Sequence, residues 1–180
     1  MIKIASFELV ICYSALAIWD PSINKKGFLE SLAQHQIQGF TWILGNVNYE
    51  VNIFDGEVGF AFIEVLQAES VSVQDDSVRA ILVPFAVGNS GVVFASPTVE
   101  NVRVIVPEGN YALVFEIKLR NDAEYLNSSR YQEDLETSLQ SIWCRFTFIP
   151  QENVEPEILR ADDEIIDSSF PFLMDAELAY

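Results

Sequence analysis

The chain has 180 residues, half of them apolar, and its net charge is −17. One domain is the natural expectation at this length, and the large apolar fraction argues against disorder. The charge is uneven, because residues 121–180 hold 14 acidic side chains against 3 arginines. Such a surface repels nucleic acid and anionic membranes and attracts basic proteins or cations. Solubility alone would also explain the charge.

The first apolar run predicts a β-strand from Phe7 to Ile18. Ala15-Leu16-Ala17 mimics a signal-peptidase site, but Lys3 is the one basic residue before the run and Glu8 sits beside it. We therefore favour a strand over a secretory signal peptide. Because no run reaches the ~18 apolar residues of a membrane span, we expect a soluble, cytoplasmic protein that does not contact membranes.

A short helix and two strands are predicted next. The residues from Phe28 to Gln36 have mostly helical spacing, and Gly39 is a candidate C-cap. Apolar and polar residues alternate from Val47 to Ile53, and Val58 to Leu66 predicts the returning strand. Asp55-Gly56 between them is a hairpin signal.

The central stretch predicts consecutive strands with a turn at each joint. The turns are indicated by Gly88-Asn89-Ser90-Gly91 and Pro107-Glu108-Gly109-Asn110. The last strand alternates strictly and has one polar-leaning face, which is typical of antiparallel strands over a core. The four predicted strands are Val78 to Ala86, Val92 to Ser96, Val102 to Val106 and Tyr111 to Leu119.

An acidic region follows Arg120. Tyr131, Leu135 and Leu139 lie at i, i+4 and i+8, which predicts a short surface helix packed by one stripe. Ile142 to Ile149 predicts a last strand. The fold class is therefore all-β, an antiparallel β-sandwich of about eight to nine strands with one or two short helices. We assign 1–150 to this domain and 151–180 to an acidic C-terminal extension, an extended tail or short helix packed on it.

Searches for catalytic motifs find none. His35 is the one histidine, which removes histidine-based metal clusters, and neither a phosphate-binding loop nor a nucleophile elbow is present. Cys12 and Cys144 lie in apolar runs and are expected as reduced thiols. The basic residues are scattered, so direct nucleic-acid binding is disfavoured. We expect a non-enzyme without a cofactor.

Acidic pairs leave two other functions open. Asp75-Asp76, Glu133-Asp134 and Asp162-Asp163-Glu164 could hold Ca²⁺ or act as a hydrolase pair. They show neither the alternating ligand pattern of calcium loops nor an EF-hand glycine, and solvated loop charge is the favoured interpretation. A cation-binding or structural β-sandwich interaction module is the main alternative, and a carboxylate-pair hydrolase is a third.

Several segments of the chain match a known pattern in order and spacing. They include Val47-Asn48-Tyr49-Glu50-Val51, Val83-Pro84-Phe85 and Val106-Pro107-Glu108-Gly109-Asn110-Tyr111-Ala112-Leu113. On these segments the chain resembles the competence protein J family, bacterial inhibitors of the DNA-entry nuclease, from about Phe7 to Leu119. The resemblance implies a protein that binds and blocks a nuclease, either of the competence type or a related toxin-like one.

The leading hypothesis is an acidic inhibitor that occupies the basic DNA-binding cleft of a partner nuclease. The shared segments are strands and turns, so no binding residue transfers from the family. A homodimer stays open as an alternative assembly. The acidic side chains predicted to bind the partner are Glu133, Asp134, Glu136, Glu155, Glu157, Asp162, Asp163 and Glu164.

Overall fold

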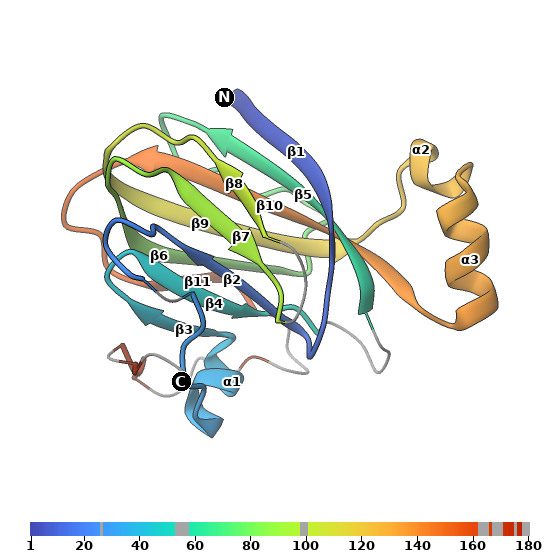
Figure 1. Cartoon of the computed structure of the whole chain (residues 1–180), viewed down its shortest axis with the longest axis horizontal. Helices are drawn as coiled ribbons and strands as arrows, with labels where there is room; N and C mark the ends of the chain where they lie inside the picture. The colour runs from blue at the N-terminus through green and yellow to red at the C-terminus, as the bar shows by residue number, and fades with distance from the viewer. Residues whose placement is uncertain are drawn as a thin grey trace.

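The computed structural model describes residues 1–25, 27–52, 58–97, 101–161, 166, 171–174 and 176–177. In this part the chain is mainly β, with two multi-stranded sheets (Figure 1). The larger sheet has the order β1 (Ile2–Val10), β5 (Val58–Gln67), β10 (Gln140–Pro150), β9 (Gly109–Leu119), β6 (Arg79–Val87) and β11 (Glu157–Arg160). The smaller has the order β3 (Phe40–Ile43), β4 (Asn46–Glu50), β2 (Ala15–Trp19), β7 (Val92–Ala95) and β8 (Val102–Val104).

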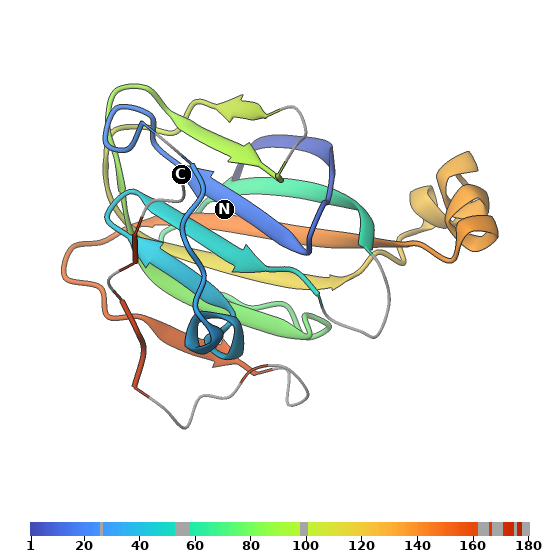
Figure 2. The same ribbon diagram turned by 60° about the horizontal axis from the view of Figure 1, so that its bottom comes forward.

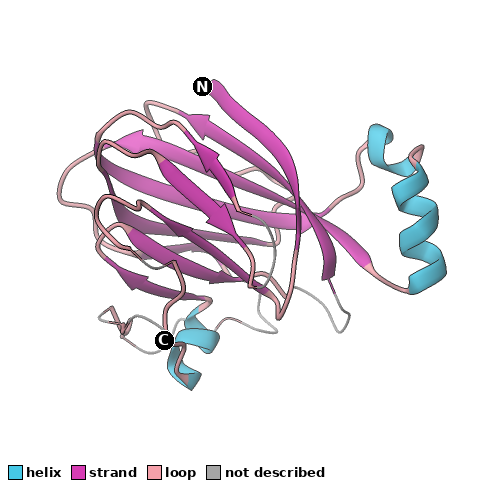
Figure 3. Ribbon diagram, in the orientation of Figure 1, coloured by secondary structure: helices cyan, strands magenta, loops and turns pink. Residues whose placement is uncertain are grey.

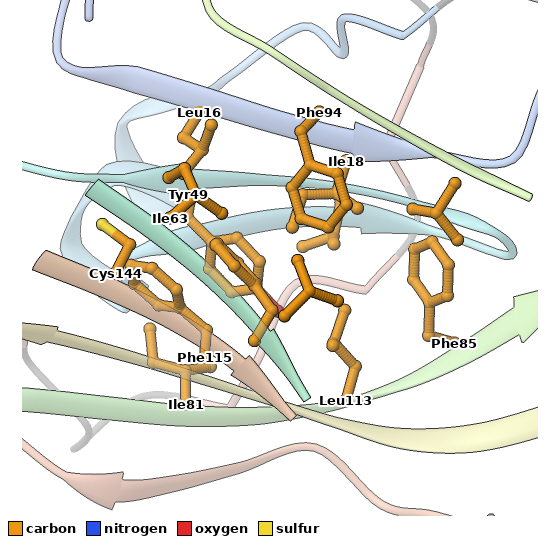
Figure 4. Close-up of a cluster of buried hydrophobic side chains, with 14 of the residues drawn as sticks. Leu16, Ile18, Tyr49, Ile63, Ile81, Phe85, Phe94, Leu113, Phe115 and Cys144 are labelled. Carbon is orange, nitrogen blue, oxygen red and sulfur yellow. The ribbon is translucent and has the colours of Figure 1, made fainter. Parts of the chain in front are cut away.

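The two sheets share one core of apolar side chains (Figure 4). Phe94 of β7 meets Phe146 of β10 with ring centroids 5.3 Å apart, and Tyr49 of β4 stacks on Phe115 of β9 at 4.2 Å. A buried cation adds a polar link, since the guanidinium of Arg79 on β6 donates to the backbone carbonyl of Glu50 on β4. The inward faces of both sheets are thereby removed from water.

Two of the predicted turn segments lie between strands as expected, but each joins strands of different sheets. Gly91 has a φ of 73°, yet residues 88–91 lead from β6 in the larger sheet to β7 in the smaller one. Residues 105–108 likewise connect β8 to β9. The strands flanking Asp55-Gly56, β4 and β5, also belong to different sheets, and the turn itself lies outside the described residues. A period of two identifies a strand and its inward face but does not select its neighbour.

The single strand predicted over residues 7–18 is wrong. β1 and β2 belong to different sheets, and Tyr13 and Ser14 between them have φ angles of 54° and 51°. Two consecutive left-handed residues end an extended segment. The apolar pattern continues across the break because both strands direct apolar residues into the same core.

Eleven strands are present in the described part instead of about eight to nine. β3 and β4 are separated by Gly45 at a φ of 68°, and β11 falls in the predicted tail, where it pairs antiparallel with β6. One pairing is parallel, between β10 and β5. The nearly continuous apolar sequence of β10 suits this position, because strands in parallel pairs are commonly covered on both faces. The division at residue 150 stays a prediction.

The polar-leaning face predicted for β9 is instead covered. Ala112 and Val114 pack in a second apolar cluster with Leu82 and Ile149, and Leu159 of β11 contacts it. Glu116 on the same face is fully buried, and its carboxylate accepts hydrogen bonds from the backbone of Gln74 and the hydroxyl of Ser77. Segments distant in sequence therefore cover this face, which a local pattern does not reveal.

Three helices are described, α1 (Ala33–Gln38), α2 (Ala123–Leu126) and α3 (Ser129–Thr137). Gly39 is the C-cap of α1 with a φ of 82°, as predicted. The spacing predicted a helical start near Phe28, but α1 begins at Ala33. Phe28 lies before the helix and packs on Trp19, with ring centroids 6.2 Å apart. None of these described helices is long and apolar enough to cross a membrane.

Candidate functional site

Helices α2 and α3 form a projection between β9 and β10, which we call the helical arm (residues 121–139). It stands away from the two sheets at one end of the molecule (Figures 1 and 3). The turned view shows the same separation (Figure 2). β9 and β10 are neighbours in the larger sheet, so the arm is a long excursion between two adjacent strands.

Capping side chains begin both helices of the arm. The carboxylate of Asp122 accepts from the backbone N–H of Tyr125 at 2.9 Å, and the hydroxyl of Ser128 accepts from that of Tyr131 at 3.2 Å. Ser138 ends α3 in the left-handed conformation at a φ of 58°. Each capping contact satisfies a backbone donor that the helix itself leaves without a partner.

A buried carboxylate joins the arm to the sheet. The Oδ2 atom of Asp134 accepts hydrogen bonds from the hydroxyls of Tyr125 and Ser141, both at 2.7 Å. The ring of Tyr131 packs edge-on against that of Tyr125, with centroids 5.3 Å apart. Burial raises the pKa of Tyr125, and its hydrogen bond to Asp134 acts in the same direction. One acidic group thus connects α2, α3 and β10.

Arg120 holds the base of the arm. Its guanidinium lies 4.6 Å from the ring of Phe62 and 5.2 Å from that of Tyr125. It also forms ion pairs with Glu8 at 2.6 Å and Asp122 at 3.1 Å. Burial would raise the pKa of Asp122, but hydrogen bonds from Tyr125 and Arg120 outweigh it, so that pKa lies below its usual value.

Other basic side chains are paired on the outward face of the larger sheet. Lys118 binds Asp76 at 2.6 Å, and Arg145 binds Glu64 at 3.0 Å. Both cations also lie over the ring of Trp143, at 4.7 and 4.6 Å. Lys118, Arg145, Glu64 and Trp143 line a hollow of about 320 Å³. Because its cations have acidic partners, this face does not offset the negative charge of the arm beside it.

The predicted partner-binding acids fall into separate groups. Glu133 and Glu136 are exposed on α3, whereas Asp134 is only 3% exposed and is committed to the contacts above. Glu155, just before β11, and Glu157, its first residue, are exposed, and β11 starts at the end of the sheets opposite the arm (Figures 1 and 2). Asp162, Asp163 and Glu164 lie outside the described residues.

Sequence reasoning missed other residues of the arm. Asp122 and Glu124 add exposed carboxylates, and Leu126 and Leu135 are 43% and 60% exposed. The predicted packing of α3 by a stripe including Leu135 is therefore wrong at that residue. Asp122 could have been found as an N-cap candidate, since Asp is favoured there. Nothing local distinguishes an exposed leucine from a buried one.

The described residues contain no group of three or more His, Cys, Asp and Glu side chains that could hold a metal. His35 is 1% exposed, and its Nδ1 atom accepts from the backbone N–H of Leu32 at 3.0 Å, at the start of α1. Cys144 is buried and Cys12 partly buried, and both are free thiols. Burial raises the pKa of the Cys144 thiol. Cys144 packs in the shared core, and His35 takes part in the start of α1.

Together these features define a class of protein, a two-sheet β protein with a projecting acidic helical arm. Residues 8–149 match the family model of competence protein J (ComJ), and the chain belongs to this family. A crystal structure of ComJ from Bacillus subtilis, described as an inhibitor of the DNA-degrading activity of NucA, matches with a TM-score of 0.59. That match has 16% identity and covers 83% of this chain and 99% of that one. A search of curated proteins gave no match.

The family match extends past Leu119, where the resemblance of the sequence motifs ends. It includes the whole helical arm and nearly all of β10. Glu133 and Glu136 therefore lie inside the matched region, whereas Glu155 and Glu157 lie beyond residue 149. The predicted acids thus divide into those inside the range that the family model matches and those beyond it.

Proposed function

We propose that this chain is a β-sandwich protein that binds and blocks a nuclease, without itself catalysing a reaction. Membership of the ComJ family carries the proposal. It is supported by the structural match to ComJ from Bacillus subtilis, which is described as inhibiting the DNA-degrading activity of NucA. We also place the chain in the cytoplasm, on the sequence argument alone.

The charge of the chain supplies a physical mechanism. A nuclease must present cations to hold DNA phosphates, so its DNA-binding cleft is electropositive. A folded surface with a net charge of −17 is attracted to that cleft and competes with DNA for it. Such inhibition needs a rigid surface and a stoichiometric complex, and it needs no catalytic group in the inhibitor.

The experiment begins with the tagged full-length chain as bait in an extract of the cells that produce it. Captured proteins are released with high salt and assayed for DNA degradation, and the responsible nuclease is purified. Titration with the chain should abolish degradation of plasmid DNA at about one inhibitor per nuclease. If the captured fraction degrades no DNA, or if degradation persists in molar excess of the chain, the proposed function is wrong.

A further inference from the structure

Two apolar side chains of the helical arm are left exposed. In α3, Tyr131 packs on Tyr125, but Leu135 one turn further is 60% exposed. A helix that packs only on its own domain normally buries the residues of such a stripe. At the end of α2, Leu126 is 43% exposed. A contiguous exposed apolar patch with a polar rim, unlike a single exposed leucine, marks a protein-binding surface, and a hollow lined by apolar side chains is one form of it.

Such a hollow lies where the arm joins the end of β9. Its volume is about 200 Å³, and its lining includes Leu119, Leu135 and Leu139 together with the two tyrosines of the arm. Leu119 is itself 36% exposed. An apolar cavity of ~150 Å³ binds a molecule as large as benzene. The hollow can therefore receive one large apolar side chain from another protein.

The charges on the helical arm determine which protein fits it. Glu124 on α2 and Glu136 on α3 are exposed, and neither has an ion-pair partner among the described residues. The nearby cations are engaged, since Arg130 binds Glu133 at 2.8 Å and Arg120 binds Glu8 and Asp122. The arm thus exposes both apolar side chains and carboxylates without a described ion-pair partner, and the two together complement a basic protein.

The arm is also organised in advance for binding. Asp134 holds α2, α3 and β10 together through two hydrogen bonds of 2.7 Å, and Arg120 holds the base of the arm. A surface that is ordered before binding loses less conformational entropy on association. An apolar contact on such a rigid element can therefore contribute much of its burial energy to affinity.

We propose that the helical arm is the surface that binds the nuclease, an inference that rests on the proposed function. Leu135 and the hollow beside it receive an apolar side chain of the nuclease, while Glu124 and Glu136 face its cations. The arm lies inside the range that the family model matches, whereas Glu155 and Glu157 lie beyond that range and stay in solvent.

The test measures inhibition of the nuclease that the unmodified chain inhibits. Leu135→Asp places a charge in the apolar contact, and Glu136→Lys reverses a carboxylate of the arm. We expect each change to weaken inhibition by about tenfold or more, which is typical of a central contact. Leu44→Asp is the matched control, because Leu44 is 58% exposed but lies in the β3–β4 turn. Glu155→Lys is the control for charge reversal.

Both controls should inhibit within about twofold of the unmodified chain. Amide hydrogen exchange should also slow across residues 121–139 when the nuclease is bound. Thermal melting identifies any variant that fails to fold. In that case the exchange measurement on the unmodified chain decides whether the nuclease binds the arm.

The assignment to the arm would be overturned if both arm variants inhibited the nuclease as strongly as the unmodified chain. It would also be overturned if the nuclease slowed amide exchange only in residues 151–160. Either result would leave the proposed function intact. If the unmodified chain did not inhibit the nuclease, the proposed function itself would be wrong.

Discussion

Tyr125 and Asp134 lie nine residues apart, and the phenol of the first donates a hydrogen bond of 2.7 Å to the buried carboxylate of the second. This contact joins the two helices of the arm beside the packing of Tyr131 on Tyr125. The order of the arm therefore depends in part on a few polar groups whose partners are specific.

Asp134→Ala should destabilise the protein by about 1–3 kcal/mol, because the hydroxyls of Tyr125 and Ser141 would lose their acceptor in a buried site. Urea denaturation measures the free energy of unfolding. Tyr125→Phe should cost less, and the double variant should fall short of the sum of the two, since both changes remove the same contact. Strict additivity would show that the contact does not couple the helices. Tyr13→Phe, at an 83% exposed residue, is the control.

Asp122 combines a helix cap with an ion pair, and two substitutions separate them. Asp122→Ala should cost about 1 kcal/mol of stability through loss of the cap. Asp122→Asn retains a capping oxygen but removes the charge facing Arg120. Since the pKa of Asp122 is lowered, its charge stabilises the fold above the unfolded carboxyl pKa, and this contribution is lost as pH falls below it. The stability difference between the unmodified chain and Asp122→Asn should therefore shrink between pH 6 and pH 3 in denaturation curves.

The buried His35 should make stability depend on pH in a second window. Burial lowers its pKa below the ordinary value of 6.5, so the folded state favours the neutral ring. Its contribution is complete above pH 6.5 and is lost as pH falls through the folded pKa, because the unfolded chain then binds the proton more readily. The melting temperature of the unmodified chain should fall from pH 7.5 to pH 5.5. In His35→Asn the melting temperature should fall less over this pH range. An equal fall would show that groups other than His35 cause the pH dependence.

Gly91 should tolerate no side chain. A Cβ atom there would lie 2.6 Å from the backbone carbonyl of Val104, and its φ of 73° disfavours other residues. Gly91→Ala should cost at least about 1–2 kcal/mol, measured by denaturation. Gly109→Ala is the matched control, because the nearest atom to its Cβ would be a ring carbon of Tyr111 at 3.5 Å. Similar losses in both variants would contradict the predicted clash.

Inhibition of the nuclease should weaken as salt rises, because ions screen the attraction between the acidic chain and a basic cleft. Measured from about 0.05 M to several hundred millimolar salt, the association rate should fall more than the dissociation rate rises. If the arm provides the charges, the association rate should depend less steeply on salt concentration in Glu136→Lys than in Glu155→Lys. Inhibition independent of salt would exclude charge attraction as the mechanism.

Local patterns predicted most of the strands, the helix C-cap at Gly39 and the turn that contains Gly91. They failed on the pairing of those strands, since turns such as residues 88–91 lead to the other sheet. They also failed on Leu135, which was expected to pack and is exposed. Asp134 illustrates the converse, because an acidic residue in a polar helix is expected in solvent but lies 3% exposed.

The alternation of residues along the chain by itself determined that this chain is mainly β, because successive side chains of an extended strand point to opposite faces and so repeat with a period of two. Its acidic composition and its family resemblance likewise follow from the residues alone. Only the tertiary structure decided which strands are neighbours, which carboxylates are committed to internal contacts, and where leucines remain open. The physical reason is that burial and strand pairing depend on contacts between residues far apart in the chain, and a local sequence pattern does not specify those contacts.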